Sequence, residues 1–476
     1  MNSPRFHRLA ALLAFPLLAA CSSDGSETGA SDISSSYRPG CKALGGPSYA
    51  LHGTALLPQG AADAYVVVEG EKIAAVETSR ANVPAGVPII DTNGVISPGL
   101  VDLHNHVAYD FLPFWNSGKR WSNRYQWARA SAYETAVKAP YNAVKNAGHM
   151  CEAVKYGEFR GLVGGTTSIQ GSMDLTCTRS WARNIEFTNF CSDHVRQDVL
   201  AVTALTQSDA DSINAQFSSG ATKAFIVHLA EGIDDSSRAE FDYLDKLGLI
   251  KPQLVAIHGT ALTAAQLQRM GQAGAKLVWS PLSNLALYGQ TTDIPSAVAA
   301  GITISIAPDW TPSGSANVLG ELKVADRVNR ERFGGLLSDQ QLVAMVTSNP
   351  AKTVAMDGEI GSIRAGLYAD LVVVRGDTSQ PYRALIDAKP ADVLLTTVGA
   401  QAFYGSNDIV SAIGDARSYV TVDACGESRV LAATESALPI PQGQESLDAV
   451  TQTFASAGVT PIPLFSCDGA PEFAFH

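Results

Sequence analysis

Two histidines and four later residues could together bind a metal ion and move protons. His104 and His106 stand two residues apart in the segment VDLHNH, so in an extended strand both imidazoles point to one face. The other four each follow a short apolar stretch, and they are His228, Glu231, His258 and Asp309. Imidazole nitrogens and a carboxylate that converge are typical ligands of zinc, and also of iron and manganese. The sequence therefore predicts a divalent metal site, provided that the fold brings these residues together.

The pattern of the chain indicates how they meet. Between residues 101 and 355, short apolar segments alternate with stretches of helical spacing such as 263–274 and 338–349. This alternation is typical of parallel strands joined by helices. In a (β/α)8 barrel the carboxyl ends of the strands converge on one face, where active sites form. We therefore expect an α/β fold in which residues 101–355 form a distorted (β/α)8 barrel.

The two flanks of this region look different from it. Residues 45–100 and 356–405 break at Gly and Pro into short apolar strands. Neither flank has enough strands to be stable alone, so we expect them to pair as a small composite β-sandwich. Residues 406–476 show no clear period, and we expect them to form a C-terminal extension.

Taken in order, the segments around these residues resemble the amidohydrolase superfamily. The resemblance covers roughly residues 48–405 and rests on ISPGLVDLHNH, GGTTSI, VHLAEG, AIHGT, WSPLSNLALYG, APDW and SNPAKTVAMDGEIGSIRAGLYADLVVV. It implies a metal-dependent hydrolase on the barrel described above. The branch that it resembles is the one-metal branch, which includes cytosine deaminases and triazine chlorohydrolases.

The resemblance also implies a role for each residue. The metal ligands fall on His104, His106, His228 and Asp309. Glu231 would carry a proton to the leaving nitrogen, and Asp309 would take one from the attacking water. His258 would orient that water or polarise the scissile group, and whether it is also a ligand stays open. Asp309 has a second interpretation, because Asp-Trp-Thr-Pro is also a good turn.

The implied reaction is hydrolysis of a C–N bond in a small molecule, by deamination or cyclic-amide cleavage. One divalent ion is expected, zinc first and iron or manganese next. Two-metal members carry a bridging lysine or carboxylate at the end of the fourth strand, which we expect over residues 198–206, and this segment offers neither there. The alternatives are a two-metal peptidase or lactonase-like enzyme and a catalytically inactive surface binding protein.

A loop rich in aromatic residues follows the first predicted barrel strand. Residues 109–141, the aromatic loop, hold nine aromatic residues interleaved with Lys119, Arg120, Arg124 and Arg129. One interpretation is a lid that stacks on a flat or anionic ligand, and the other is a packed cover or partner surface. The candidate substrate-binding residues at strand ends and in this loop are Trp115, Trp127, Asn284 and Trp310.

The first twenty residues read as a lipoprotein signal peptide. Arg5 and Arg8 precede an apolar run from Leu9 to Ala20, which is too short to span a membrane. Leu18-Ala19-Ala20-Cys21 resembles a bacterial lipobox, in which Cys21 is the lipidated residue. Residues 21–44 are rich in Ser, Gly and Asp and should be a flexible tether. We expect a protein anchored by lipid outside the cytoplasm, on an outer membrane or cell surface.

The net charge bears on possible partners, and the cysteine content agrees with that location. The chain has 34 Lys and Arg against 46 Asp and Glu, a net charge of −12, which argues against nucleic-acid binding. Of seven cysteines, Cys21 is assigned to lipidation, which leaves an even number for disulfides in an oxidising compartment. The sequence cannot choose among the pairings. Pairing nearest neighbours gives Cys177–Cys191, Cys425–Cys467 and Cys41–Cys151.

Replacing the lipidation residue tests the anchor. Cys21→Ser should release the protein from membranes and leave its catalysis unchanged, because the tether separates Cys21 from the barrel. The measurement is the share of protein that sediments with membranes after a salt wash. A mutant that stays with the membrane fraction would contradict the lipobox interpretation.

Overall fold

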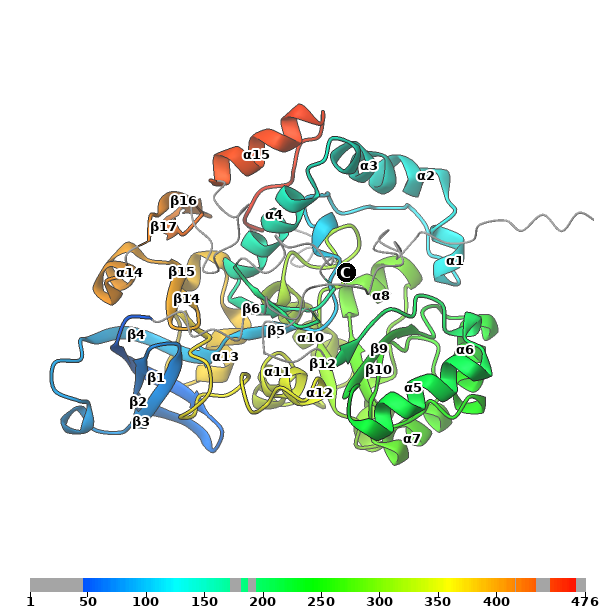
Figure 1. Ribbon diagram of the computed structural model, residues 1–476, viewed down its shortest axis with the longest axis horizontal. Helices are drawn as coiled ribbons and strands as arrows, with labels where there is room; N and C mark the ends of the chain where they lie inside the picture. Colours follow the sequence, from blue (N-terminus) through cyan, green and yellow to red (C-terminus); the bar gives the residue numbers. More distant parts are fainter. Residues whose placement is uncertain (1–45, 172–180, 187–193, 416, 434–445, 468–476) are drawn as a thin grey trace, which may run out of the picture.

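The structure is a computed structural model, and it describes most of the chain beyond the N-terminus. The described residues are 46–171, 181–186, 194–415, 417–433 and 446–467. Within them the strands form one nine-stranded sheet, one five-stranded sheet and one three-stranded sheet (Figure 1). The expected signal peptide and tether, residues 1–44, lie outside the described residues and stay predictions.

Two parallel sheets carry the residues singled out above. The three-stranded sheet contains β5 (Leu100–Asp102), β6 (Thr166–Ile169) and β7 (Arg183–Asn184). The five-stranded sheet contains β8 (Val195–Arg196), β9 (Ala224–Leu229), β10 (Leu254–His258), β11 (Lys276–Trp279) and β12 (Ile304–Ile306). Strands β9 and β10 are apolar over most of their length because both of their faces are covered. A parallel bridge between Asn105 and Asp309 connects the end of β5 with the end of β12.

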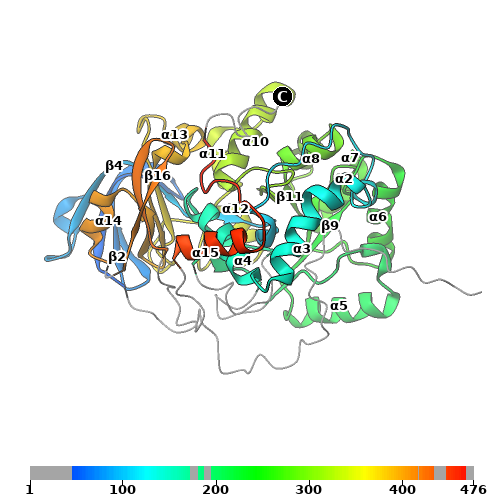
Figure 2. The ribbon, with the colours of Figure 1, turned by 90° about the horizontal axis from the view of Figure 1, so that it is seen from above.

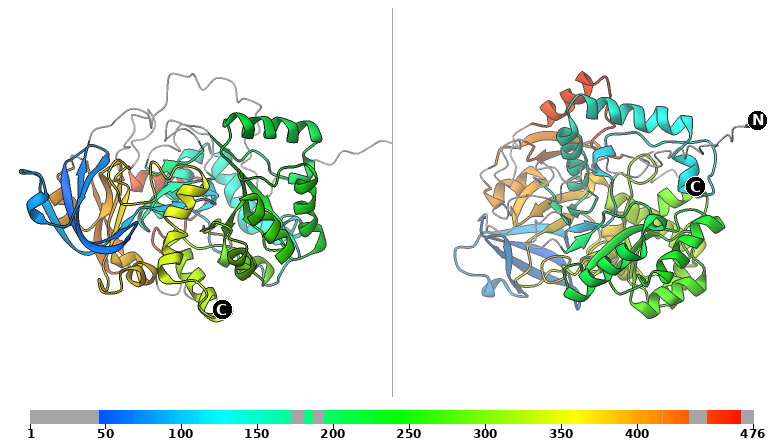
Figure 3. Two further views of the ribbon diagram at one scale, coloured as in Figure 1. Left: turned by 90° about the horizontal axis from the view of Figure 1, so that it is seen from below. Right: turned by 45° about the vertical axis from the view of Figure 1, so that its right-hand side comes forward.

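Helices connect the strands and cover their outer side. The longer ones are α3 (Ala139–Asn146), α4 (Met150–Leu162), α5 (Gln207–Ser219), α6 (Asp235–Lys246), α7 (Ala264–Ala273), α8 (Pro281–Tyr288), α10 (Val318–Arg332) and α15 (Leu447–Ser456). The shorter ones are α1 (Arg124–Trp127), α2 (Ser131–Tyr133), α9 (Ile294–Ala299), α11 (Asp339–Ala344), α12 (Ser348–Thr353), α13 (Pro381–Asp387) and α14 (Asn407–Ile413). The green helices α5, α6 and α7 lie outside the five-stranded sheet (Figure 3). No helix among the described residues combines the length and apolar character needed to cross a membrane.

Two helices begin where the sequence places them. Thr263 and Ser338 each cap a helix, α7 and α11, through a hydroxyl that accepts from the backbone N–H three residues on. Gln266 and Gln341 return a side-chain contact to the capping residue, which completes a capping box in both cases. The predicted helices at 263–274 and 338–349 are confirmed, although the second is split between α11 and α12.

The nine-stranded sheet is built from both flanks of the chain. Its strands are β1 (Tyr49–Leu57), β2 (Gly60–Glu69), β3 (Lys72–Glu77), β4 (Ile89–Pro98), β13 (Leu371–Val374), β14 (Val393–Val398), β15 (Gln401–Gly405), β16 (Val420–Ala424) and β17 (Glu427–Leu431). The flanks join where β4 pairs antiparallel with β13, and the blue and orange strands lie side by side in Figure 2. The flanks therefore form one continuous sheet, and the two-layer sandwich stays a prediction. Strands β16 and β17 extend the sheet beyond residue 405, into the part expected to be an extension.

Strand β13 fastens this sheet to the rest of the molecule. Leu371 and Val373 point into a core that belongs to the nine-stranded sheet. Val372 and Val374 point the other way, into the large core shared with the helices and the parallel strands. A run of four apolar residues is needed here because both faces of the strand are buried.

The fourth parallel strand lies in a different place from the one expected. The sequence predicted it over 198–206, but β8 spans Val195–Arg196, and residues 202–204 form a short 3₁₀ helix. Val202 is buried in the large core there, so its apolar character serves a helical turn instead of a strand. The pattern of a short apolar run does not distinguish a buried helical turn from a strand. Asp198 pairs with Arg196 at 2.6 Å near the surface, away from the site described below.

One predicted disulfide is confirmed. Cys425 and Cys467 are bonded, which ties the C-terminal segment to the turn between β16 and β17. Cys151 is also disulfide-bonded. Cys41, Cys177 and Cys191 lie outside the described residues, so the pairings assigned to them stay predictions. Helix α15, before Cys467, packs on α4 through Phe454 and Tyr156 (Figure 1).

A buried ion pair links the three-stranded sheet to the nine-stranded one, and its loss should destabilise the protein. Arg183 donates from Nε and Nη2 to the two carboxylate oxygens of Asp370, at 2.7 and 3.1 Å. Asp370→Asn removes the charge of the carboxylate that the buried guanidinium of Arg183 contacts through two hydrogen bonds, which should lower the free energy of unfolding by about 3–5 kcal/mol. Urea denaturation measures this loss in the free energy of unfolding. The control Asp198→Asn, in a surface pair, should cost about 0–1 kcal/mol, and equal losses would contradict this interpretation.

Candidate active site

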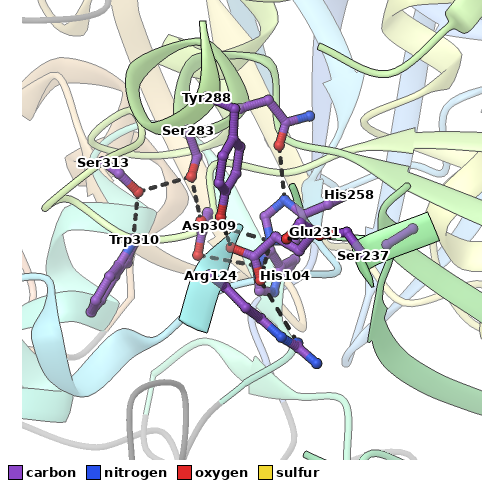
Figure 4. A network of polar contacts seen from close by, with 12 residues as sticks. His104, Arg124, Glu231, Ser237, His258, Ser283, Tyr288, Asp309, Trp310 and Ser313 are labelled. Carbon is purple, nitrogen blue, oxygen red and sulfur yellow. Dashed lines mark hydrogen bonds and ion pairs between the residues drawn. The ribbon is translucent and has the colours of Figure 1, made fainter. Parts of the chain in front are cut away.

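Four imidazoles and one carboxylate meet at the carboxyl ends of the parallel strands. His104 and His106 follow β5, His228 lies in β9, and His258 ends β10. From the ring of His104, the centroids of the other three rings lie 4.8 to 5.2 Å away. Asp309 follows β12, and its carboxylate faces the rings of His104 and His258 (Figure 4). The structure therefore brings together the residues that the sequence assigned to one site.

Asp309 holds the two ends of this set of strands together. Its Oδ1 lies 3.0 Å from Nε2 of His104 and 3.5 Å from Nε2 of His106. Its backbone N–H donates to the carbonyl of His104, and its carbonyl accepts from the N–H of His106. Its φ of +73° is uncommon for a residue with a side chain, as is the φ of +67° at His258. Backbone strain at both residues is typical of a functional site.

The residues present fit a divalent metal ion. Nε2 of His228 is buried and has no hydrogen-bond partner among the described residues. An unpaired buried polar atom is costly unless a ligand satisfies it. Ligands of a tetrahedral zinc ion lie about 3.4 Å apart, because each is about 2.1 Å from the metal. The distances from Asp309 to His104 and His106 are close to this value. His104, His106, His228 and Asp309 would hold the ion.

The protonation states suit such a site. Burial lowers the pKa of His106 to about 4, and burial together with the neighbouring histidines holds the pKa of His228 well below its usual range. Burial opposes ionisation of Asp309, but the nearby His104 and His258 hold its pKa below the usual range for a carboxyl. Neutral imidazoles and an ionised carboxylate are the forms that bind metals.

His258 is held in one orientation beside the ligands. The hydroxyl of Thr292 donates to the carbonyl of His258, so it can accept from Nδ2 of Asn284 at 3.2 Å. Oδ1 of Asn284 then faces Nδ1 of His258 at 2.9 Å, and Nδ1 must carry the hydrogen. Nε2 therefore faces the site, 4.0 Å from Oδ2 of Asp309. It lies farther from Asp309 than His104 and His106 do, which supports a place beside the metal.

Glu231 lies next to this cluster and is 2% exposed. The hydroxyl of Tyr288 donates to its Oε1 at 2.6 Å, and Nη1 of Arg124 lies 3.8 Å from its Oε2 (Figure 4). Oε2 also lies 3.8 Å from Nε2 of His258 and has no hydrogen-bond partner in the described part of the chain. Sequence reasoning missed both supporting residues, although Tyr288 closes the WSPLSNLALYG motif and Arg124 was among the noted basic residues.

Behind Asp309 a chain of hydrogen bonds leads away from the site. Oδ2 of Asp309 accepts from the hydroxyl of Ser283 at 2.6 Å, and Ser283 lies 2.8 Å from the hydroxyl of Ser313. The indole N–H of Trp310 donates to Ser313 at 2.6 Å. Ser283 and Trp310 thus help to orient the carboxylate that faces the histidines.

The aromatic loop packs over this region. The ring of Trp310 lies 5.4 Å from that of His106 and 5.3 Å from that of Tyr109. Trp115 and Trp127 are 8% and 1% exposed, and the indole N–H of Trp127 donates to the hydroxyl of Tyr288. The predicted substrate-binding residues are therefore largely buried among protein atoms, and Asn284 orients His258. This arrangement agrees with the packed cover that was one of the two interpretations of the loop.

A buried carboxyl that no sequence motif marks lies beyond β7. Burial raises the pKa of Glu186 to about 7, and its Oε1 accepts from Nε2 of Gln170 at 3.0 Å. Nε2 of Gln170 also lies 3.3 Å from Oε1 of Gln197. No motif surrounds Glu186, so only the spatial arrangement reveals this polar cluster at the strand ends.

Comparison with curated proteins identifies relatives of this chain. Residues 194–403 match the amidohydrolase family. A 5-methylthioadenosine/S-adenosylhomocysteine deaminase of Syntrophobacter fumaroxidans is 26% identical over 159 residues, which are 31% of this chain and 36% of that protein. An S-triazine hydrolase of Gordonia rubripertincta is 27% identical over 211 residues, which are 43% of this chain and 40% of that protein. The matches thus span less than half the length of these relatives.

Solved structures share the fold. A zinc-bound adenosine deaminase of Xanthomonas campestris aligns with a TM-score of 0.59 at 17% identity, covering 75% of this chain and 93% of that one. A guanine deaminase of Bradyrhizobium japonicum aligns with a TM-score of 0.60 at 15% identity, covering 76% and 100%. These likenesses imply a TIM-like α/β barrel. Over residues 194–403 the chain is similar to the amidohydrolase family, and the sequence relatives named above are a deaminase and a hydrolase.

Removing one buried imidazole tests the metal site. His228→Ala deletes a ligand whose Nε2 has no protein partner, so the variant should lose nearly all of its divalent metal, whereas the wild type should hold about one ion per chain. Metal content is measured by mass spectrometry after gel filtration. The control His149→Ala, at the start of α4, should keep the wild-type content. Unchanged metal in the His228 variant would exclude His228 as a ligand.

Proposed function

We propose that the protein is a metal-dependent hydrolase that cleaves a C–N bond in a small molecule, by deamination or by opening a cyclic amide. One observation carries the proposal: four imidazoles, Asp309 and Glu231 lie at the strand ends in three overlapping groups whose ligand atoms are within 4.8 Å of one another in each group. The deaminases and the triazine hydrolase among the relatives support it. The fold alone would not, because barrels of this kind carry many activities.

The arrangement assigns a task to each group. When bound, the divalent ion acts as a Lewis acid and lowers the pKa of water. Water adds its oxygen to the reacting carbon, the C–N bond breaks, and the nitrogen leaves with a proton. Oε2 of Glu231 takes the proton from the water and passes it to the leaving nitrogen. Nε2 of His258, an acceptor because Nδ1 donates to Asn284, orients the attacking water.

The finer features of this proposal follow from the same residues. We propose a single ion, with zinc as the first choice, because the ligand atoms converge around Asp309. A two-metal peptidase or lactonase is not favoured. An inactive binding protein is not favoured either, because the buried carboxylate of Glu231 and Nε2 of His258 lie beside the proposed ligands. We also propose that the two parallel sheets are the two parts of one distorted barrel, since the Asn105–Asp309 bridge joins their ends.

The substrate class proposed is an aminated heterocycle or a cyclic amide. The aromatic rings beside His106, from Trp310 and Tyr109, would suit a flat molecule. A screen of such compounds for released ammonia or ring-opened product tests this directly. For location, we propose a lipid anchor at Cys21, which the lipobox and the preceding arginines support.

The proton shuttle has its own test. Glu231→Gln keeps the volume of the side chain but cannot carry a proton, so turnover should fall by about 10²–10⁴-fold while the metal content stays at its wild-type level. Steady-state kinetics on a substrate found in the screen measures this, beside the control Glu152→Gln in α4. Near-normal turnover of the Glu231 variant would remove Glu231 from the mechanism and leave the proton transfer to Asp309.

A further inference from the structure

Part of the aromatic loop runs directly beside the loop that carries Glu231. The backbone N–H of Ile233 donates to the carbonyl of Ser122 at 2.7 Å. The N–H of Arg124 donates to the carbonyl of Glu231 at 3.3 Å. Two backbone hydrogen bonds thus join the two loops on either side of position 232. The aromatic loop is therefore fastened to the segment of the candidate proton shuttle.

A glycine makes this close approach possible. Gly232 has a φ of +150°, and it forms an antiparallel bridge with Asn123. A Cβ atom at this position would lie 2.3 Å from Oγ of Ser237, 2.5 Å from the carbonyl oxygen of Ser122 and 2.8 Å from Cα of Asn123. The last two are backbone atoms, which cannot move aside as a side chain could. Any larger residue at 232 would therefore push the aromatic loop away from Glu231.

The fastened segment delivers Arg124 to two buried carboxylates. Arg124 is 5% exposed; its Nη1 lies 3.8 Å from Oε2 of Glu231, and its Nη2 donates to Oε1 of Glu240 at 3.3 Å. The other oxygen of Glu240 accepts from the N–H of Ala230, and the hydroxyl of Tyr125 donates to Oε1. Buried carboxylates are costly without a counter-charge, and Arg124 supplies it to both.

The same segment also supports the second residue that contacts Glu231. Trp127 donates its indole N–H to the hydroxyl of Tyr288 at 2.8 Å. That hydroxyl donates its own hydrogen to Oε1 of Glu231 at 2.6 Å, so its direction is fixed (Figure 4). Oε1 is engaged, whereas Oε2 has no hydrogen-bond partner in the described part of the chain and faces Nε2 of His258. The two oxygens of one carboxylate thus have different surroundings.

We propose that the aromatic loop is a positioning element of the active site, and that it makes Oε2 the oxygen of Glu231 that carries the proton. Tyr288, oriented by Trp127, anchors Oε1 and fixes the plane of the carboxylate. Arg124 compensates the buried charge of the carboxylate, with Nη1 3.8 Å from Oε2. Neither residue touches the reacting atoms, so both act through Glu231. This inference rests on the proposed function of Glu231 as the shuttle.

Removing the anchor should lower kcat and leave KM nearly unchanged. Tyr288→Phe deletes one hydroxyl, frees Oε1 and lets the carboxylate rotate, which should reduce kcat by about tenfold to a hundredfold. The matched control is Tyr243→Phe, whose hydroxyl donates to the carbonyl of Leu205 on the outer side of the barrel, and its kcat should match the wild type. A change in KM alone, or an unchanged kcat, would overturn the assignment of Tyr288.

Moving the loop without altering any side chain of the site is a second test. Gly232→Ala should also lower kcat by about tenfold or more, because Arg124 and Trp127 shift with the backbone that carries them. Gly220→Ala, at the exposed end of α5 where a Cβ meets no atom within 4 Å, controls for the strain of a positive φ and should keep its kcat. Equal kcat in the two variants would contradict the positioning role of the loop.

A stability measurement on metal-depleted protein separates this inference from the proposed function. In the wild type, Glu231→Gln should leave the melting temperature unchanged or lower it. In an Arg124→Met background, Glu231→Gln should raise the melting temperature, because it removes a buried carboxylate that has lost the positive charge of Arg124. Additive shifts would overturn the pairing of Arg124 with Glu231. Coupled shifts in a protein that hydrolyses none of the screened compounds would overturn the hydrolase proposal and leave the pairing intact.

Discussion

The burial of several ionisable groups in one small space is the constraint on which the rest of the structure depends. Imidazoles and carboxylates lose their hydration at the strand ends, and burial is the largest cause of the lowered pKa values of His106 and His228. Such groups are tolerated only when each one finds a partner. Asp309 faces two imidazoles, Arg124 faces two carboxylates, and the remaining buried donor atoms suit a metal ion.

The architecture satisfies this constraint with backbone as well as with side chains. Parallel strands carry the histidines and Asp309 to one edge, and the exchange of backbone hydrogen bonds between Asp309, His104 and His106 fixes the distance between the first and last of these strands. The aromatic loop then covers the site, so that the charges act on one another with little screening by water. The nine-stranded sheet packs through β13 into the core shared with the parallel strands, and the Arg183–Asp370 pair joins it to β7. It thereby stabilises the parallel strands away from the site.

Much of the site could be predicted from the sequence, and the reasons why the rest could not are physical. The histidines, Glu231 and Asp309 stand at the ends of apolar segments, where spacing alone reveals them. Tyr288 and Arg124 reach Glu231 from 57 and 107 positions away along the chain, respectively, and no local pattern marks such contacts. The fourth strand was misplaced because a short apolar run suits a strand and a buried turn equally. The pairing of the two flanks was foreseen, but the inclusion of β16 and β17 was not, although VTVDA in β16 alternates between apolar and polar residues.

The central claim is that these strand ends form one metal centre with Glu231 beside it. The most direct measurement is an anomalous difference map from crystals of the metal-loaded protein, recorded at the absorption edge of the bound metal. The account predicts one strong peak about 2 Å from the ligand atoms of His104, His106, His228 and Asp309, with Glu231 outside the ligand set. Two peaks in the site, or a peak held by other residues, would contradict it.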